Sequence, residues 1–515
     1  MDTKKTHTKT EASKISELPS RRNFLKQAGL GALVTAGFSL AAPLLSSCSI
    51  IDGSLPDSSL NFSLVPSAPI NFKRDCDVLI VGSGIAGFCA AIEPLNAGKK
   101  VLMIEKLELL GGSSYKSSGV LKLCGSKLQT KTQEETLTAL WNERLAALSA
   151  QYDPAFISQL KDVFFAQAEW ADMLIDSFKL EFLDTGDYLG DEVKNRYLIP
   201  KNGLGDNDSL MITLRDELTK RGLSTITKLT AQNFIIDDAQ KISGMRFYSP
   251  QDGEITDVFA QKIIMCTGGF IANQELVHLN LEDWQYCSCI DVLSLGEGLR
   301  LGKQVHASLK NMKTKPLLTP DISHAFWWPL LSNALCLDVQ GKRFVNEDIP
   351  GSAPETCFRE QQGFYWIVLD ESFMKSPLGP SIAKSFAEFK KRGFGPFDDL
   401  GQLAQETGIP LDNLQKSVQD FNNALREEAE DSFARKNMRR TLDAPYWAMR
   451  LMPARFESIG GVEIDSQGRA LNTNGSPIAN LYYAGAASNL CFDGLASAGT
   501  LGWIAGKTAT NELEV

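Results

Sequence analysis

One segment near residue 80 constrains the fold more than any other part of the chain. A short apolar run, Cys76 to Val81, leads directly into the glycine pattern Gly82-Ser83-Gly84-Ile85-Ala86-Gly87. A helix-like stretch, residues 88–97, and a second apolar run, residues 100–104, follow, and the second run ends at Glu105. Strand, glycine turn, helix, strand and acid in this order are typical of a Rossmann-like βαβ unit. The sequence therefore predicts an α/β fold with a parallel sheet.

The three glycines and the acid of this segment each have a physical role in binding a dinucleotide. Gly82 permits the tight turn, Gly84 lets the backbone approach a pyrophosphate at the helix N-terminus, and Gly87 allows close packing of helix and strand. Glu105 stands 18 positions beyond Gly87 and can accept both hydroxyls of a ribose. An acid at this position favours a ribose without a 2′-phosphate, so it favours FAD or NAD over NADP.

Further glycine-rich turns indicate FAD rather than NAD. Gly111-Gly112-Ser113-Ser114 offers amides and hydroxyls to a ribityl-diphosphate, and two later apolar runs end at Thr267-Gly268-Gly269 and at Gly485. We expect residues 499–502 to open a helix over residues 503–511, with its N-terminus facing the N1/O2 edge of a flavin. The candidate cofactor-binding residues are Gly82, Gly84, Ile85, Ala86, Gly87, Glu105, Lys106, Gly111, Gly112, Ser113, Ser114, Ala231, Thr267, Gly268, Gly269, Gly485, Thr500 and Leu501.

These blocks together resemble the fumarate reductase/succinate dehydrogenase flavoprotein family over roughly residues 75–510. Supporting segments are Gly296-Glu297-Gly298-Leu299, the Arg-Phe-x-Asn-Glu pattern from Arg343 to Glu347, and Ser458 to Val462. Their order and spacing resemble the soluble single-chain branch, which includes fumarate reductases, urocanate reductases and 3-ketosteroid dehydrogenases. No histidine stands beside the Gly111-Gly112 pair, so we expect FAD to be bound non-covalently.

The resemblance implies a discontinuous Rossmann-like FAD-binding domain with an inserted α+β capping domain over the flavin. The FAD-binding parts would be residues 74–290 and 441–515, and the capping domain would be residues 291–440. It also implies an FAD-dependent oxidoreductase that acts on a CH–CH or C=C bond beside an electron-withdrawing group. The small-molecule substrate would lie between the capping domain and the flavin.

The chain departs from the charged members of this family where they bind a dicarboxylate. The proton-donating Arg of those members, eight residues after Arg343, corresponds to Gly351, and a family His corresponds to Glu457. The final glycine-rich segment, residues 493–498, also lacks an Arg that grips a substrate carboxylate. Because a buried unpaired carboxylate is costly, we argue against fumarate or succinate as the substrate.

An apolar segment stands instead where the charged members carry a Glu and an Arg. Phe326, Trp327 and Trp328 are predicted, with Arg343, to bind the substrate. They suit a bulky, weakly charged molecule such as a steroid, a terpenoid or an aromatic enone, although ordinary packing of the capping domain is the alternative.

A hydride delivered at flavin N5 requires a proton donor on the opposite side of the substrate double bond. Tyr115, His324 and Glu457 are the candidate catalytic residues, and for Tyr115 a packing role is the alternative.

The direction of the reaction is not fixed by these residues. We favour ene reduction, with electrons from a separate cytochrome or quinone-linked protein, because the chain has no Cys-x-x-Cys pair and no haem motif. No metal site is expected. One alternative is a 3-ketosteroid-type dehydrogenase that runs in the oxidative direction. Another is a surface binding protein in which FAD is structural and catalysis has been lost.

The first 47 residues are predicted to be a targeting signal rather than a folded domain. Arg21 and Arg22 precede a weakly apolar stretch, residues 28–45, as in a twin-arginine signal peptide, which exports folded proteins with their cofactors. Leu45-Ser46-Ser47-Cys48 resembles the lipoprotein processing box, so we expect acylation of Cys48 and a tether over residues 48–73. The alternatives are a basic helix, a transmembrane anchor or an ordinary cysteine. The predicted location is the periplasm or the cell surface.

Charge and hydropathy exclude two further classes. The chain carries 52 Lys and Arg against 62 Asp and Glu, a net charge of −10, so we expect no nucleic-acid partner. Beyond the first 47 residues no run is long and apolar enough to cross a membrane, so membrane contact is expected only through the lipid anchor.

Overall fold

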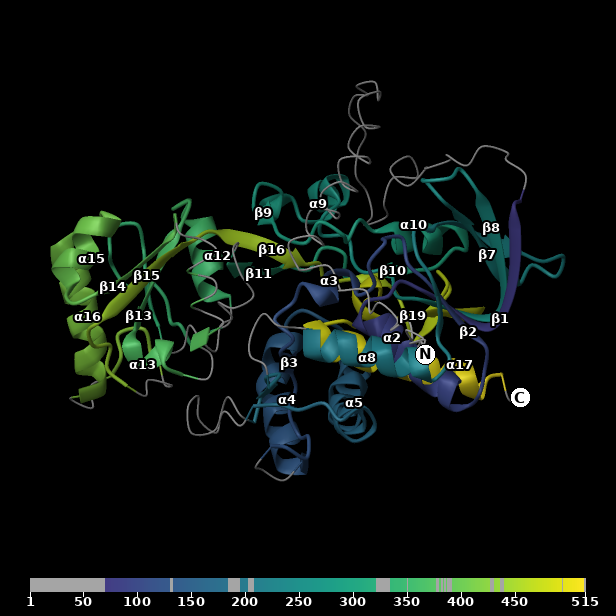
Figure 1. The fold of residues 1–515 in the computed structure, drawn as a ribbon, viewed down its shortest axis with the longest axis horizontal. Coiled ribbons are helices and arrows are strands. Elements are labelled where there is room, and N and C mark those ends of the chain that lie inside the picture. The colour runs from purple at the N-terminus through teal and green to yellow at the C-terminus, as the bar shows by residue number, and fades with distance from the viewer. Residues whose placement is uncertain are drawn as a thin grey trace, which may run out of the picture. The chain divides into compact units, whose positions relative to one another are not determined.

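The computed structural model describes most of the chain after the predicted tether (Figure 1). The described residues are 70–129, 133–183, 195–201, 208–320, 334–349, 351–376, 391–426, 430–435, 440–492 and 494–513, with isolated positions between 376 and 391. The predicted signal peptide, Cys48 and nearly all of the tether lie outside the described residues. So do His324, Phe326, Trp327 and Trp328.

The largest sheet is built on the predicted βαβ unit. Five of its eight strands run parallel in the order β5-β2-β1-β8-β19, with β18 antiparallel at the outer edge of β19. A hairpin, β6 and β7, pairs with the other end of β8. Leu79 and Ile80 in β1 are fully buried, as expected for an apolar strand covered on both faces. The strands are β1 (Phe72–Val81), β2 (Val101–Ile104), β5 (Ser224–Ile226), β6 (Thr230–Ile236), β7 (Ile242–Tyr248), β8 (Ile255–Met265), β18 (Arg469–Leu471) and β19 (Pro477–Tyr483).

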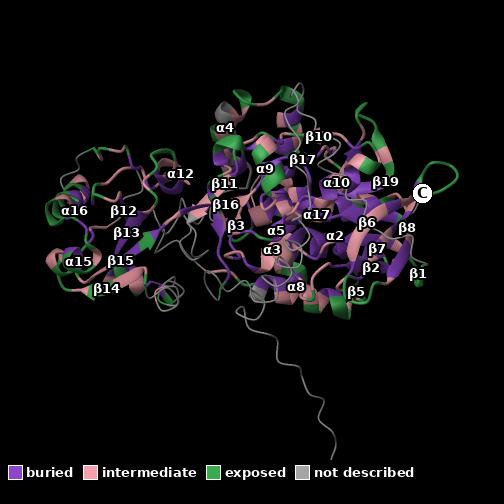
Figure 2. Cartoon of the chain, turned by 90° about the horizontal axis from the view of Figure 1, so that it is seen from above, coloured by how far each residue is buried: buried purple, intermediate pink, exposed green. Residues whose placement is uncertain are grey.

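Two helices from opposite ends of the chain pack together against this sheet. α2 (Ile85–Asn96) and α17 (Gly494–Asn511) lie side by side, and both are largely buried (Figure 2). A Cβ added at Gly502 would lie 2.1 Å from the Ala86 carbonyl oxygen, so only glycine permits this contact. The expectation that the last helix starts at residue 503 is therefore wrong: it starts at Gly494, and its internal glycines serve helix packing rather than a turn.

A second lobe is built around a four-stranded antiparallel sheet, β12-β13-β15-β14. Its strands are β12 (Leu335–Leu337), β13 (Tyr365–Asp370), β14 (Gly393–Phe397) and β15 (Tyr446–Leu451). Its helices include α12 (Ser352–Arg359), α13 (Glu371–Met374), α15 (Leu400–Thr407) and α16 (Leu411–Arg426). β13 is buried along its whole length because apolar clusters form on both faces of this sheet. β15 extends this lobe to Leu451, past the expected boundary at residue 440.

A small sheet carries the chain from the second lobe back to the first. β16 (Pro453–Glu457) follows β15 after one residue and lies between β9 (Ser288–Cys289) and β11 (Leu317–Pro320). α12 packs on β11 and β16. The remaining elements named in this description are α3 (Gly112–Tyr115), β3 (Leu121–Lys122), α4 (Gln133–Ser149), α5 (Pro154–Phe178), β4 (Tyr197–Leu198), α8 (Asp208–Lys220), α9 (Gln274–Asn280), η2 (Glu282–Trp284), α10 (Glu297–Gln304), β10 (Leu309–Lys310), β17 (Gly461–Val462) and η3 (Gly485–Ala487).

No helix in the part of the chain that the structure describes is long and apolar enough to cross a bilayer. No disulfide joins any of the nine described cysteines, from Cys76 to Cys491.

Candidate flavin site

A cavity lies at the carboxyl ends of β1, β2 and β8. Ligands bind at this edge of open α/β sheets because the strand-to-helix turns present free backbone amides there. Its lining comes from segments spread over more than 400 residues of sequence, from Val81 to Ala498. The cavity is therefore a product of the whole fold rather than of one motif.

The first glycine turn forms one end of the cavity. Gly82 has a φ of +102°, and a Cβ there would lie 2.3 Å from the Cys266 carbonyl oxygen, so the turn requires glycine. Gly84 is the N-cap of α2 and supplies no side chain to cap the helix. No acid occupies the first turn of α2, so the positive end of the helix dipole is available to a ligand anion.

Glu105 is buried beside this turn. Its Oε2 accepts hydrogen bonds from Ser83 N at 3.0 Å and Ser83 Oγ at 2.7 Å, and its Oε1 accepts one from Leu107 N at 2.9 Å. The carboxylate is thus held in one orientation at the cavity wall. Each carboxylate oxygen has further acceptor capacity, which a ribose hydroxyl can use.

The second glycine pair is tied to the first turn by two hydrogen bonds. Gly111 N donates to Ser83 Oγ at 2.9 Å, and Ile85 N donates to Ser114 Oγ at 3.0 Å. Gly111 has a φ of +116°, which lets the chain turn back towards α2. The two glycine segments, far apart in the predicted pattern, therefore form one rigid cradle.

An ion pair closes one side of the cavity. Lys106 Nζ donates to Glu297 Oε1 at 2.7 Å and to the Leu293 carbonyl oxygen at 3.0 Å. Burial alone would lower the pKa of Lys106, but the neighbouring Glu297 carboxylate outweighs burial and the pKa is raised. Lys106 therefore remains a cation at neutral pH.

The opposite wall is formed by three chain segments. Thr267, Gly268 and Gly269 meet the strand end Phe456-Glu457-Ser458, where Ser458 Oγ accepts a hydrogen bond from Phe270 N at 2.9 Å. The start of α17, at Gly494 and Leu495, completes the wall. Its helix N-terminus lies several residues earlier in the sequence than we expected from Thr500 and Leu501.

Most of the predicted cofactor residues line the cavity. Gly87 and Gly111 do not line it, since they shape the turns, and Thr500 and Leu501 are buried within α17 instead. The lining residues from the prediction are Gly82, Gly84, Ile85, Ala86, Glu105, Lys106, Gly112, Ser113, Ser114, Ala231, Thr267, Gly268, Gly269 and Gly485. Sequence reasoning missed Ser83, Asp291, Ser294, Glu297, Phe456, Ser458, Leu495 and Ala498. Of these, Glu297 had a signal, because it belongs to the Gly-Glu-Gly-Leu segment.

These features fit FAD. The cavity joins an uncapped helix N-terminus, which suits a pyrophosphate, to an oriented acid, which suits a ribose. Thr267 lines the cavity, and its Oγ1 is buried with no hydrogen-bond partner among the described residues. Among the described residues no group of three or more His, Cys, Asp or Glu is placed to hold a metal ion.

Two of the three predicted catalytic residues fall on described residues. Glu457 lines the cavity, and its Oε1 accepts a hydrogen bond from Cys491 Sγ at 3.6 Å. Tyr115 ends α3, is half-buried and packs back on Gly111 rather than lining the cavity. The catalytic roles of Tyr115, His324 and Glu457 stay predictions.

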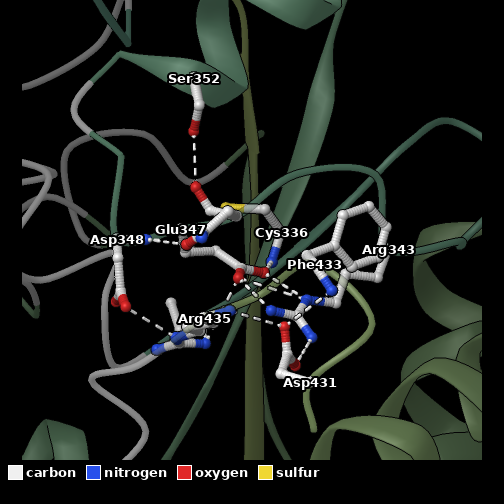
Figure 3. A network of polar contacts seen from close by, with 10 residues as sticks. Cys336, Arg343, Glu347, Asp348, Ser352, Asp431, Phe433 and Arg435 are labelled. Carbon is white, nitrogen blue, oxygen red and sulfur yellow. Dashed lines mark hydrogen bonds and ion pairs between the residues drawn. The ribbon is translucent and has the colours of Figure 1, made fainter.

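Arg343 lies in a buried charge network of the second lobe (Figure 3). Its guanidinium donates to Glu347, with Nη2 to Oε2 at 2.7 Å, and to Asp431. It also stacks on Phe433, with 4.9 Å from Cζ to the ring centroid. Arg435 joins Glu347 from the other side, at 3.4 Å. The donors of Arg343 are thus used inside this lobe, and its predicted contact with substrate has no support from the geometry.

The fold and the cavity define a class of protein, the FAD flavoproteins. The family model described as "FAD binding domain" matches residues 77–502, so the chain belongs to this family and FAD is its cofactor. Within the class it is a flavoprotein of the fumarate reductase/succinate dehydrogenase type, which confirms the predicted family.

Known proteins of similar sequence and fold agree with this assignment. The urocanate reductase of Eggerthella lenta is 24% identical over 437 residues, covering 82% of this chain and 71% of that protein. The acrylate reductase flavoprotein subunit of Shewanella woodyi is 27% identical over 526 residues, covering 91% and 92%. The crystal structure of a Rhodococcus jostii RHA1 3-ketosteroid-Δ4-(5α)-dehydrogenase has a TM-score of 0.63 at 19% identity, covering 87% of this chain and 99% of that one. The predicted α/β FAD-binding fold with a capping domain is confirmed, and the chain is an FAD-dependent oxidoreductase acting on C=C or CH–CH groups.

Proposed function

We propose that the protein reduces a carbon–carbon double bond that stands beside an electron-withdrawing group. The observation that carries this proposal is the cavity itself, which is lined both by the cradle for FAD and, on the opposite wall, by the Glu457 carboxylate. The printed activities of the two sequence relatives, urocanate reductase and acrylate reductase, are both reductions of such bonds. Bound FAD supplies hydride transfer to one carbon of the double bond.

The chain itself would supply the proton and the shape of the site. Glu457 is the described candidate for moving a proton, since its carboxylate lies in the cavity wall and can exchange a proton at Oε2 beside Gly494. Phe456 and Leu495 add apolar surface to the same wall, which excludes water from the reacting carbons. These features support a substrate with an apolar body.

The electrons would come from a separate redox protein. Among the described residues no group of three or more His, Cys, Asp or Glu is placed to hold a redox metal. The relative from Shewanella woodyi is a flavoprotein subunit, a description that points to a partner in that system. We propose that the present chain likewise receives electrons from a partner protein. Separately, we propose that it is exported by the twin-arginine route and anchored by a lipid at Cys48.

The test is an anaerobic assay of the purified holoenzyme with reduced methyl viologen and a panel of enones and unsaturated acids. Oxidation of the viologen that depends on the alkene supports the proposal. Turnover only with oxidising dyes and saturated ketones would establish the oxidative alternative, and no turnover in either direction with full flavin occupancy would establish the binding-protein alternative.

Glu457→Gln keeps the shape of the side chain and removes the carboxyl group that is proposed to transfer the proton. We expect the rate of alkene reduction to fall about 100-fold or more, the usual contribution of a positioned acid. Glu108→Gln is the matched control, because Glu108 is exposed and pairs with Lys228 at 3.3 Å outside the cavity. Equal rates for both variants would remove Glu457 from the reaction.

Export has its own experiment. Arg21→Lys together with Arg22→Lys should retain the protein in the cytoplasm, and Cys48→Ala should release an exported protein from the membrane fraction. Unchanged fractionation of both variants would contradict the predicted twin-arginine export and lipid anchoring.

A further inference from the structure

A second cavity, the α4–α5 cavity, lies between two helices of the first lobe. α4 and α5 follow one another in the chain and lie side by side (Figure 1). Lys122 of β3 and three residues from the segment that leads into α17 also line this cavity. Its described lining shares no residue with the lining of the flavin cavity, so the two are separate sites.

The spacing of the lining residues shows that one face of each helix is turned towards the cavity. α4 contributes positions at the i, i+3, i+7 spacing of a single helix face, Trp141, Arg144 and Leu148. α5 contributes a second face of the same kind, Leu160, Val163, Phe164 and Gln167. The two faces meet at Trp141 and Phe164, whose ring centroids are 5.6 Å apart. The helices therefore touch at this ring pair and leave the cavity beside it.

The inner surface of the α4–α5 cavity is apolar and aromatic. Trp141 and Phe164 are 5% and 4% exposed, and Leu490 is fully buried. Phe492 adds a third ring to the lining. Aromatic rings favour offset or edge-on contacts with another ring. This surface therefore suits a flat aromatic body.

The charged side chains of the described lining, Lys122 and Arg144, are both basic. Both are only partly buried, which places their cationic ends towards solvent at the mouth of the cavity. The Arg144 guanidinium stacks on Phe164, with 4.8 Å from Cζ to the ring centroid, so it is held against the cavity wall. An apolar interior with cations at the mouth suits a ligand that has an apolar body and an anionic group.

We propose that the α4–α5 cavity is a second ligand site and that it binds a small aromatic carboxylate. The ring would lie among Trp141, Phe164 and Phe492, and the carboxylate would pair with Arg144 and Lys122 at the mouth. A guanidinium can donate two parallel hydrogen bonds to one carboxylate. The site is additional to the FAD site and does not depend on the proposed reaction.

The two sites are connected through the chain segment before α17. Phe492 N donates a hydrogen bond to Ser497 Oγ at 3.1 Å, and both residues line the α4–α5 cavity. Gly494 and Leu495, which stand between them in the sequence, line the flavin cavity. A ligand in the α4–α5 cavity would therefore contact the segment that forms one wall of the flavin site, without entering that site.

The test compares 1-naphthoate with 1-naphthamide, which has the same ring system and a neutral amide in place of the carboxylate. Binding of each compound to the oxidised, FAD-loaded protein is measured by isothermal titration calorimetry. We expect 1-naphthoate to bind about tenfold or more tightly than 1-naphthamide, because hydrogen bonds between ionised partners are stronger than those of a neutral amide. Equal affinity for the two compounds would overturn the proposal.

Arg144→Met removes the charge at the mouth and keeps an apolar side chain. The affinity for 1-naphthoate should fall about tenfold or more, and the affinity for 1-naphthamide should change by about threefold at most. Arg196→Met is the matched control, because Arg196 pairs with Glu143 of α4 at 3.0 Å and does not line the cavity. An unchanged affinity for 1-naphthoate in Arg144→Met, or equal losses in the two variants, would contradict the proposal.

Leu148→Trp tests the location of the bound compound. Leu148 lines the cavity and is half-buried, so an indole there can fill the cavity from its mouth. Binding of 1-naphthoate should be lost while the flavin absorbance spectrum stays unchanged. Binding that persists in this variant would place the compound elsewhere and reject the site. If Leu148→Trp does not fold, the comparison of Arg144→Met with Arg196→Met still decides.

Discussion

Glu347→Gln tests how the second lobe is held together. The Glu347 carboxylate is fully buried and receives four donors: Cys336 N at 3.1 Å, Arg343 Nε at 3.1 Å, Arg343 Nη2 at 2.7 Å and Arg435 Nη1 at 3.4 Å (Figure 3). Replacing it with an amide turns one acceptor into an NH₂ group that faces two guanidinium groups. Breaking a buried ion pair from one side costs about 3–5 kcal/mol.

Glu355→Gln is the comparison for the predicted loss of about 3–5 kcal/mol in Glu347→Gln. Glu355 also pairs with two cations, Lys315 and Arg359, but its side chain is 25% exposed, so its loss should cost about 0–1 kcal/mol. Both variants lose one carboxylate and keep its volume. Urea unfolding followed by circular dichroism should show a large fall in the midpoint for Glu347→Gln and little change for Glu355→Gln. Equal midpoints would refute the argument that burial decides the strength of these pairs.

Three further predictions concern the flavin cradle, catalysis and acid stability. Gly502→Ala places a methyl group 2.1 Å from the Ala86 carbonyl oxygen, so α17 must move away from α2 and the ratio of flavin to protein absorbance of the purified enzyme should fall; full flavin occupancy would contradict this packing. Tyr115→Phe should lower turnover while FAD is retained, and an unchanged rate would exclude the Tyr115 hydroxyl from the reaction. Burial would raise the pKa of Asp431, but Arg343 outweighs it and the pKa lies below the ordinary 3.8. The stability from this pair is thus fully present above the ordinary value and is lost as the pH falls through the lower folded pKa. Asp431→Asn should flatten the acid limb of a stability profile, and parallel limbs for the two proteins would refute this.

The part of the flavin site that lies in the first βαβ unit could be predicted from the sequence, because its conformation is set by residues that follow one another in the chain. A strand, a glycine turn and a helix follow one another between Cys76 and Ala97, and the positive φ of Gly82 is a property of that turn. Glu105 was predictable for the same reason, since it ends the next strand of the same unit. The βαβ unit and the dinucleotide site followed from this segment, whereas FAD and the family also required the later glycine-rich turns and the Arg-Phe-x-Asn-Glu pattern.

The glycines of α17 show where such reasoning fails. The sequence predicts a turn at Gly499 and Gly502, yet both lie inside α17. There, Gly499 packs against the Trp170 ring and Gly502 against the backbone of Ala86. The sequence alone does not distinguish a glycine that permits a turn from a glycine that permits close packing of two helices. Only the partner, more than 300 residues away, distinguishes them.

Other site residues could not be found because they belong to no pattern. Phe456 reaches the cavity from β16, while Asp291 and Ser458 reach it from the residues that follow β9 and β16, and their neighbours in sequence carry no signature of a cofactor.

The cavity that α2 and α17 line together has a consequence for biosynthesis. One wall is translated near residue 84 and the facing wall near residue 498, so a ribosome must add more than 400 residues between them. A nascent chain that already displays its first glycine turn still lacks the wall that α17 contributes to the cavity. Flavin capture is therefore a late event after chain elongation, and it reports that the polypeptide has been made through its final glycine-rich helix.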